Sequence, residues 1–234
     1  MPATIKMVVF DMAGTTVADD GAIALAFQRA MQEWGYFIPV SLINPLMGYK
    51  KPEAIRIMLS EYETNEDRIT TKLVDRIHDR FLAHMLGHYR YAAIMPLPHV
   101  EASFARLRSA GIRVALDTGF SRDIADVILG RLGWLRNGLV DDLVASDEVP
   151  KGRPYPYMIN RLMERAGITD PLEVVKVGDT EVDIHEGLNA GCLFSIAVTT
   201  GAFTADALVP HNPSFIIDDL SQLMPLLEHV TATA

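Results

Sequence analysis

Short apolar runs alternate along the chain with segments of helical periodicity, and this alternation constrains the fold more than any other feature of the sequence. The apolar runs are rich in Val, Ile and Leu and occupy residues 5–10, 112–116, 174–177 and 193–198. Their lack of regular polar alternation is typical of strands buried on both faces. Segments with apolar residues at three- and four-residue spacing occupy residues 100–109, 121–132, 155–166 and 182–190. This order predicts an α/β fold whose core is a Rossmann-like, doubly wound parallel sheet.

One long interval interrupts the alternation. Helical patterns without a convincing strand occur between the first two apolar runs, at residues 22–34, 52–61 and 68–89. We therefore predict an α/β core domain formed by residues 1–18 and 92–234, with a helical cap domain formed by residues 19–91. Ligands of open α/β sheets bind outside the carboxyl ends of the strands, so a cap inserted after the first strand is expected to lie above the site and to act as a lid.

The charge and cysteine content exclude several classes of function. The formal net charge is −9, which argues against non-specific nucleic acid binding, since that needs clustered Lys and Arg. The single cysteine, Cys192, excludes a disulfide framework and favours a reducing compartment. No run approaches the ~18 apolar residues of a membrane span, and no signal peptide pattern is present. We predict a cytoplasmic protein that acts on a small molecule, with no nucleic acid or membrane partner.

Carboxylates and a threonine follow the predicted strands at the points where these end. Asp11 follows the first run, Asp117 and Thr118 follow the second, and Asp179 follows the run at 174–177. Because these ends share one edge of a parallel sheet, the carboxylates would repel one another without a divalent cation, and hard oxygen ligands suit Mg²⁺. Asp11 is a candidate nucleophile for phosphoryl transfer, with Thr118 and nearby amides as ligands of the phosphoryl oxygens. Arg153 lies in the loop at residues 151–154, between the second and the later predicted strands, and can pair with both the phosphoryl group and the nucleophile.

The alanine at position 13 restricts the chemistry of Asp11. A second aspartate two residues after the nucleophile would supply a general acid for a phosphate ester, and its absence would forfeit about 10²–10⁴ in rate. Ala13 cannot carry a proton. Two interpretations stay open: the site binds its ligand with little turnover, or its leaving group needs no carboxylic acid.

Four motifs, in this order, resemble those of the haloacid dehalogenase-like (HAD) superfamily. They lie at residues 11–17, 117–119, 153 and 178–183, with arginine at position 153 where most members have lysine. The sequences Asp-x-Ala-Gly-Thr from Asp11 and Gly-Arg-Pro around Arg153 are similar to those of the phosphonoacetaldehyde hydrolase (phosphonatase) subgroup. The resemblance covers nearly the whole chain. It implies a Rossmann-like core with a helical cap, Mg²⁺ as cofactor, and a homodimer formed through the cap.

The resemblance also implies roles for individual residues. The expected metal ligands are Asp11, the Ala13 carbonyl, Asp179 and Asp183. The expected substrate contacts are Ala13, Gly14, Met47 and Gly119. Asp183 has a simpler alternative, because an acidic residue near the start of a helix is favourable without any metal.

A lysine in the predicted cap domain can explain why position 13 carries no acid. Met47 begins a Met-Gly-x-x-Lys pattern that places Lys51 at the imine-forming position of phosphonatases. When phosphonoacetaldehyde is bound as an imine, its organic fragment leaves as an enamine once the C–P bond breaks, so no acid is needed at position 13. An ordinary lysine with a pKa of ~10.4 is neutral in only about one molecule in 2,500 at pH 7. Lys51 therefore needs burial or a nearby cation such as Lys50, and its alternative is a solvated residue at a helix start.

Three departures limit the resemblance. Ala54, Phe120 and Ala22 stand where phosphonatases have histidine, tyrosine and cysteine. The sequence thus predicts a Mg²⁺-dependent HAD-type hydrolase that cleaves a small phosphonate or phosphate ester through an aspartyl-phosphate, similar to phosphonoacetaldehyde hydrolase. The alternatives are a small-molecule phosphomonoesterase of the phosphoglycolate phosphatase kind, and a ligand-binding module with low turnover.

Overall fold

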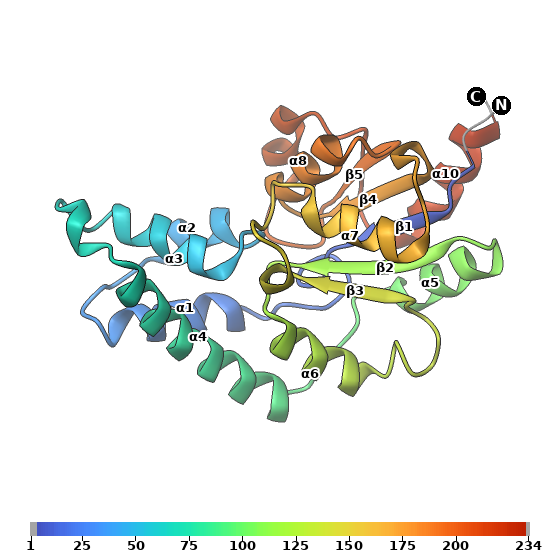
Figure 1. Cartoon of the computed structure of the whole chain (residues 1–234). Coiled ribbons are helices and arrows are strands. Elements are labelled where there is room, and N and C mark those ends of the chain that lie inside the picture. The colour runs from blue at the N-terminus through green and yellow to red at the C-terminus, as the bar shows by residue number, and fades with distance from the viewer. Residues whose placement is uncertain (1–3, 233–234) are drawn as a thin grey trace.

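The computed structural model describes residues 4–232 and contains a six-stranded, wholly parallel sheet in the order β3-β2-β1-β4-β5-β6 (Figure 1). The strands are β1 (Met7–Phe10), β2 (Arg113–Thr118), β3 (Asp142–Ala145), β4 (Val174–Gly178), β5 (Phe194–Val198) and β6 (Phe215–Ile217). β1 lies between β2 and β4, with Phe10 in register with Leu116 on one side and Val177 on the other. The carboxyl ends of these three strands are therefore neighbours.

Helices cover both faces of the sheet. Those outside the insert are α5 (Val100–Ser109), α6 (Arg122–Leu132), α7 (Tyr157–Ala166), α8 (Glu181–Ala190), α9 (Ala205–Leu208) and α10 (Leu223–Ala232). Val8 and Phe10 of β1 belong to a hydrophobic cluster with α5, α6 and α10, whereas Met7 and Val9 belong to a second cluster with α7. Since alternate residues of one strand face opposite layers, β1 is buried on both sides, as its apolar run predicts. The predicted α/β, doubly wound fold is confirmed.

The interval between β1 and β2 is a helical insert. Its helices are α1 (Ala22–Gln32), α2 (Val40–Ile43), α3 (Lys51–Ser60) and α4 (Thr71–Tyr91). α1 packs on α4, where the rings of Phe27 and Phe81 lie 4.4 Å apart between centroids. Figure 1 shows these helices gathered to one side of the sheet, facing its carboxyl edge. This arrangement supports the division into a core of residues 1–18 and 92–234 and a cap of residues 19–91, which we retain as a proposal.

The sequence patterns miss the two edge strands. Each of β3 and β6 contains only three consecutive apolar residues, at 143–145 and 215–217, and so short a run does not stand out from the surrounding loops. The short α2 is also missed, for the same reason. Short 3₁₀ turns occur at Asn44–Leu46, Glu66–Arg68, Ser146–Glu148, Pro171–Glu173, Val209–His211 and Leu220–Gln222. Within residues 4–232, no helix has the length and apolar character needed to cross a bilayer.

Candidate active site

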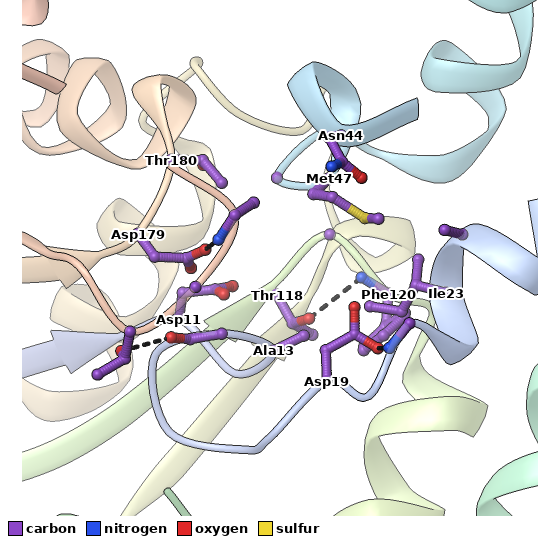
Figure 2. A pocket seen from close by; sticks show the side chains of 18 of the residues that line it. Asp11, Ala13, Asp19, Ile23, Asn44, Met47, Thr118, Phe120, Asp179 and Thr180 are labelled. Atoms are coloured by element: carbon purple, nitrogen blue, oxygen red, sulfur yellow. Dashed lines mark hydrogen bonds between the residues drawn. The ribbon is translucent and has the colours of Figure 1, made fainter. Parts of the chain in front are cut away.

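A cavity of about 330 Å³ lies at the carboxyl edge of the sheet, between the core and the insert (Figure 2). Eight of the residues that the sequence predicts for the site line it: Asp11, Ala13, Gly14, Met47, Lys51, Thr118, Gly119 and Asp179. Arg153 and Asp183 are not among the lining residues. The ends of β1, β2 and β4, which are far apart in sequence, thus converge here because β1 lies between β2 and β4.

Asp11 and Asp179 face the cavity from the ends of β1 and β4 (Figure 2). Both carboxyls are buried. Burial, strengthened by the negative charge of Asp183, raises the pKa of Asp11 to about 6, although Arg153 opposes this. Burial and the negative charge of Asp11 raise the pKa of Asp179 to about 8. Two close, desolvated carboxylates of this kind are stabilised by a divalent cation between them.

The surroundings of Asp179 are closely fitted. Its two oxygens accept hydrogen bonds from the Thr15 hydroxyl at 2.9 Å and the Ala202 amide at 2.8 Å. A Cβ atom built on Gly14 would lie 2.6 Å from an Asp179 oxygen, and one built on Gly201 would lie 1.9 Å from it. Gly14 also has a φ of +89°, which side chains rarely adopt. The orientation of this carboxylate is therefore set by the backbone on two sides.

Arg153 lies beneath Asp11 and has no exposed side-chain surface. Its guanidinium contacts Asp11 at 2.7 Å, Glu186 at 2.9 Å and Asp183 at 3.1 Å, and it also pairs with Asp117. The predicted pairing of Arg153 with Asp11 is present. Contact with a phosphoryl group stays a prediction, because the guanidinium is already surrounded by four carboxylates.

The sequence patterns miss a second buried cation, Lys176 of β4. Its ammonium lies 3.1 Å from Asp183 and 3.4 Å from Glu186, and it also pairs with Asp117. Burial opposes the charged form, yet these carboxylates raise the pKa of Lys176 above its usual value. Burial would raise the pKa of Asp117, but Arg153 and Lys176 lower it overall. A lysine inside an apolar run predicted to be buried on both faces is the signal that could have found this residue.

Removing Lys176 is expected to destabilise the fold strongly. A Lys176→Met variant keeps much of the side-chain volume but leaves buried carboxylates without their cation, which costs about 3–5 kcal/mol of unfolding free energy. Urea denaturation followed by circular dichroism measures the loss. The matched control is Lys6→Met, which removes an exposed ion pair with Glu173 and should cost less than about 1 kcal/mol. Equal losses in the two variants would show that the buried network contributes nothing special.

Asp183 lies in the first turn of α8 and does not line the cavity. Its carboxylate accepts hydrogen bonds from the Thr180 hydroxyl at 2.5 Å and the Thr180 amide at 3.3 Å, closing a capping box. It also contacts both Arg153 and Lys176. These contacts are those of the helix-start alternative that the sequence left open.

Two sets of oxygen atoms could hold a metal ion. Asp11, Asp117 and Asp183 each offer a carboxylate oxygen within 4.8 Å of the others. Arg153 and Lys176 already lie against this triad, and a further cation there would meet two positive charges. Asp11, Ala13 and Asp179 line the cavity instead. The residues present therefore fit a hard divalent cation, and the cavity-facing set avoids the competing cations.

Lys51 is 3% exposed and lines the same cavity as Asp11. Its ammonium donates a hydrogen bond to the Met47 carbonyl at 2.6 Å and lies 5.2 Å from the centroid of the Phe120 ring. Burial lowers the pKa of Lys51 to about 8, although the charge of Asp11 opposes the shift. The cation that assists the shift is Arg153, whereas the sequence suggested Lys50. The alternative of a solvated residue at a helix start is wrong, since the side chain is buried.

The cap segment that carries Lys51 is held closely against the core. A Cβ built on Gly119 would lie 2.6 Å from the Tyr49 carbonyl, and one on Gly48 would lie 2.3 Å from the Thr180 hydroxyl. The Tyr49 hydroxyl also donates a hydrogen bond to Glu181 at 3.2 Å. The two glycines thus allow the helical insert to approach the core closely at this edge of the cavity.

Comparisons with known proteins agree with this arrangement. Residues 5–191 match the family model of the haloacid dehalogenase-like hydrolases. Phosphonoacetaldehyde hydrolase of Bacteroides fragilis is 33% identical over 206 residues, which cover 85% of this chain and 77% of the relative. That of Parabacteroides distasonis is 36% identical over 209 residues, again covering 85% and 77%. The crystal structure of a phosphonoacetaldehyde hydrolase like protein from Oleispira antarctica superposes with a TM-score of 0.84 at 21% identity, covering 99% of this chain and 94% of the other.

Proposed function

Because the chain belongs to the haloacid dehalogenase-like hydrolases and is related to phosphonoacetaldehyde hydrolases, we propose that it cleaves a small phosphonate through an aspartyl-phosphate on Asp11. Phosphonoacetaldehyde is the substrate we favour. The observation that carries this proposal is a buried lysine, Lys51, in the same cavity as the nucleophile. A phosphate monoesterase has no need of an amine there, whereas an aldehyde substrate can form an imine with it.

The first step activates the substrate. With a pKa of about 8, about one Lys51 in ten is neutral at pH 7, against about one in 2,500 for an ordinary lysine. The amine attacks the aldehyde, and loss of water gives a protonated imine. The imine accepts the electron pair of the breaking C–P bond, so Ala13 can stand where a phosphatase needs an acid.

The second step transfers the phosphoryl group. An oxygen of Asp11 attacks phosphorus as the C–P bond breaks, and the organic fragment leaves as an enamine on Lys51. Arg153, 2.7 Å from Asp11, orients the nucleophile. Thr118 and the amide of Gly119, two residues of the cavity wall, would hold phosphoryl oxygens. Water then hydrolyses the aspartyl-phosphate, and hydrolysis of the enamine releases acetaldehyde. Met47 and Gly14 line the remaining walls.

Mg²⁺ is part of the proposal. Asp11, the Ala13 carbonyl and Asp179 would hold it, with Asp183 supporting the site through Arg153. The ion would supply positive charge next to the transferring phosphoryl group. Its contribution is separate from that of Lys51, which acts on the aldehyde.

A substrate panel tests the proposed function. Phosphate release is measured with Mg²⁺ from phosphonoacetaldehyde, phosphoglycolate and an aryl phosphate. We expect phosphonoacetaldehyde to give the highest kcat/KM. Preference for phosphoglycolate would favour the phosphomonoesterase alternative, and no turnover by a folded, Mg²⁺-binding protein would favour a low-turnover binding module.

Mg²⁺ is expected to raise the melting temperature, and more so at pH 8.5 than at pH 6. Binding needs ionised carboxylates, and the raised pKa values of Asp11 and Asp179, about 6 and about 8, leave Asp179 mostly protonated at pH 6. At about 100 times the dissociation constant the shift should be roughly 5–10 °C. Differential scanning fluorimetry at both pH values measures it. Asp179→Asn should lose the shift, and Asp79→Asn on the outer face of the cap should keep it. A shift that is unchanged in Asp179→Asn would exclude this ligand set.

The cap also exposes several large apolar side chains, which supports the proposed homodimer. Large apolar side chains are exposed at Leu25, Trp34, Phe37, Val40 and Tyr62, with Phe37 71% exposed. Single exposed apolar residues are common, but several on one small unit favour a protein contact. Light scattering over a range of protein concentrations tests the dimer.

A further inference from the structure

Imine formation at Lys51 needs a group that moves protons, and the residues expected for that task are apolar. Ala54 and Phe120 are buried and offer no proton donor. The other titratable side chains among the described cavity residues are Asp11, Asp19 and Asp179. Asp11 and Asp179 belong to the phosphoryl end of the cavity. Asp19 is therefore the one titratable group left to serve Lys51 among the described lining residues.

Asp19 is placed to do this. It lies just before α1, and Figure 2 shows its carboxylate at the part of the cavity wall where Phe120 and Ile23 lie, on the far side of Thr118 from Asp11. The Phe120 ring is also the surface over which the Lys51 ammonium lies, at 5.2 Å. The charge of Asp19 acts on Lys51, holding its pKa higher than burial alone would. Asp19 is exposed, so it can exchange protons with solvent at the cavity mouth.

A simpler role for Asp19 is structural. One carboxylate oxygen accepts a hydrogen bond from the Gly21 amide at 3.1 Å, at the start of α1. The Ile23 backbone amide is also a hydrogen-bond partner of this carboxylate, and a helix-start role accounts for both bonds. Such a role also gives no reason for the carboxylate to line the cavity, since an asparagine or serine would cap the helix as well.

We propose that Asp19 is the proton-transfer residue for imine formation at Lys51. This inference rests on the proposed function, and it adds a catalytic group that the family motifs do not contain. The carboxylate takes a proton from the Lys51 ammonium, and the freed lone pair forms the C–N bond while the carbonyl electrons move to oxygen. A proton then passes from nitrogen to that oxygen through solvent at the mouth. Asp19 returns its proton to the hydroxyl, which leaves as water as the nitrogen lone pair closes the C=N bond. Lysine ammonium and aldehyde thus give protonated imine and water, with Asp19 unchanged.

The test measures the rate of imine formation directly. The full-length protein with Mg²⁺ is mixed with phosphonoacetaldehyde and quenched with borohydride at timed intervals, and mass spectrometry follows labelling of the peptide that holds Lys51. Asp19→Asn keeps the hydrogen bond from Gly21 but cannot carry the proton, and labelling should slow by about 10²-fold. Asp20→Asn is the matched control, because Asp20 is the neighbouring carboxylate, 77% exposed and absent from the described cavity wall. It should label at the wild-type rate.

A second variant guards against a merely structural effect. Asp19→Ala should also label slowly, and added formate should restore its rate in proportion to concentration, since a small carboxylic acid can occupy the vacated space. A loss that formate does not restore, or wild-type labelling in Asp19→Asn, overturns the role of Asp19. If the wild-type protein itself is not labelled at Lys51, the proposed function fails together with this inference. Labelling of the wild type with no effect of Asp19→Asn leaves the proposed function standing.

Discussion

Asp11→Asn is expected to lower turnover of every substrate by at least about 10⁴-fold while the protein stays folded, because the amide is a poor nucleophile and no phospho-enzyme can form. Steady-state phosphate release measures the loss, and circular dichroism checks the fold. Asp79→Asn, an exposed carboxylate of α4, is the control and should keep wild-type kinetics. A folded Asp11→Asn variant with ordinary activity would refute the assignment of the nucleophile.

The same variant should gain stability at neutral pH. The pKa of Asp11 is about 6 in the folded chain against an ordinary 3.8. A carboxyl with a raised pKa favours the folded state when protonated and opposes it when ionised, so stability falls as pH rises from about 4 to about 6. Above that range the ionised group costs of order 1–3 kcal/mol, which asparagine avoids. An inactive variant that is also more stable than wild type at pH 7, and not at pH 4, is the expected signature of a strained functional group.

The sequence predicts those strands whose apolar runs are long enough to be recognised. The central strands coincide with apolar runs of four residues or more, and β1 lies within the run at residues 5–10. β3 and β6 each contain only three consecutive apolar residues, which is too short a pattern to predict a strand, and they are held in place by pairing with β2 and β5. Edge strands depend on a sheet that already exists, so local sequence cannot reveal them.

The cavity-facing residues followed from the strand ends, since a parallel sheet brings its carboxyl ends to one edge. The buried ion network, in contrast, could not be predicted from the strand ends. Lys176 and Glu186 are brought to Arg153 by the packing of α8 on β4, which no spacing encodes. Asp19 was missed for another reason: an aspartate before a helix is common, and only the position of the cap shows that it lines the cavity.

The contacts of Arg153 in the buried network support only one of the two roles that the sequence predicts for this residue. Arg153 was expected to hold both the nucleophile and the phosphoryl group, yet its guanidinium contacts four carboxylates and no cavity surface. It is thereby suited to fixing Asp11. In the proposed mechanism, binding of the phosphoryl group would then depend more on Thr118 and the nearby amides, which line the cavity, and on a bound metal ion.

Lys51→Arg is expected to lower phosphonoacetaldehyde turnover by at least about 10³-fold, because a guanidinium keeps its charge and cannot form the imine. Hydrolysis of an aryl phosphate, which needs no imine, should fall much less, and the ratio of the two kcat/KM values measures the effect. Lys50→Arg is the matched control, since Lys50 donates a hydrogen bond to the Val149 carbonyl that arginine can also donate.

The pH dependence of the wild type distinguishes an activated lysine from an ordinary one. With a pKa of about 8 for Lys51, the rate of borohydride trapping should rise about tenfold per pH unit below pH 8 and level off above it. A lysine with its usual pKa would give a rate that still rises at pH 9.5. Full phosphonoacetaldehyde turnover in Lys51→Arg would remove the imine from the mechanism. Without the imine, nothing in the site would accept the electron pair of the breaking C–P bond. Because Ala13 also supplies no acid, a phosphate ester with a good leaving group would become the better substrate.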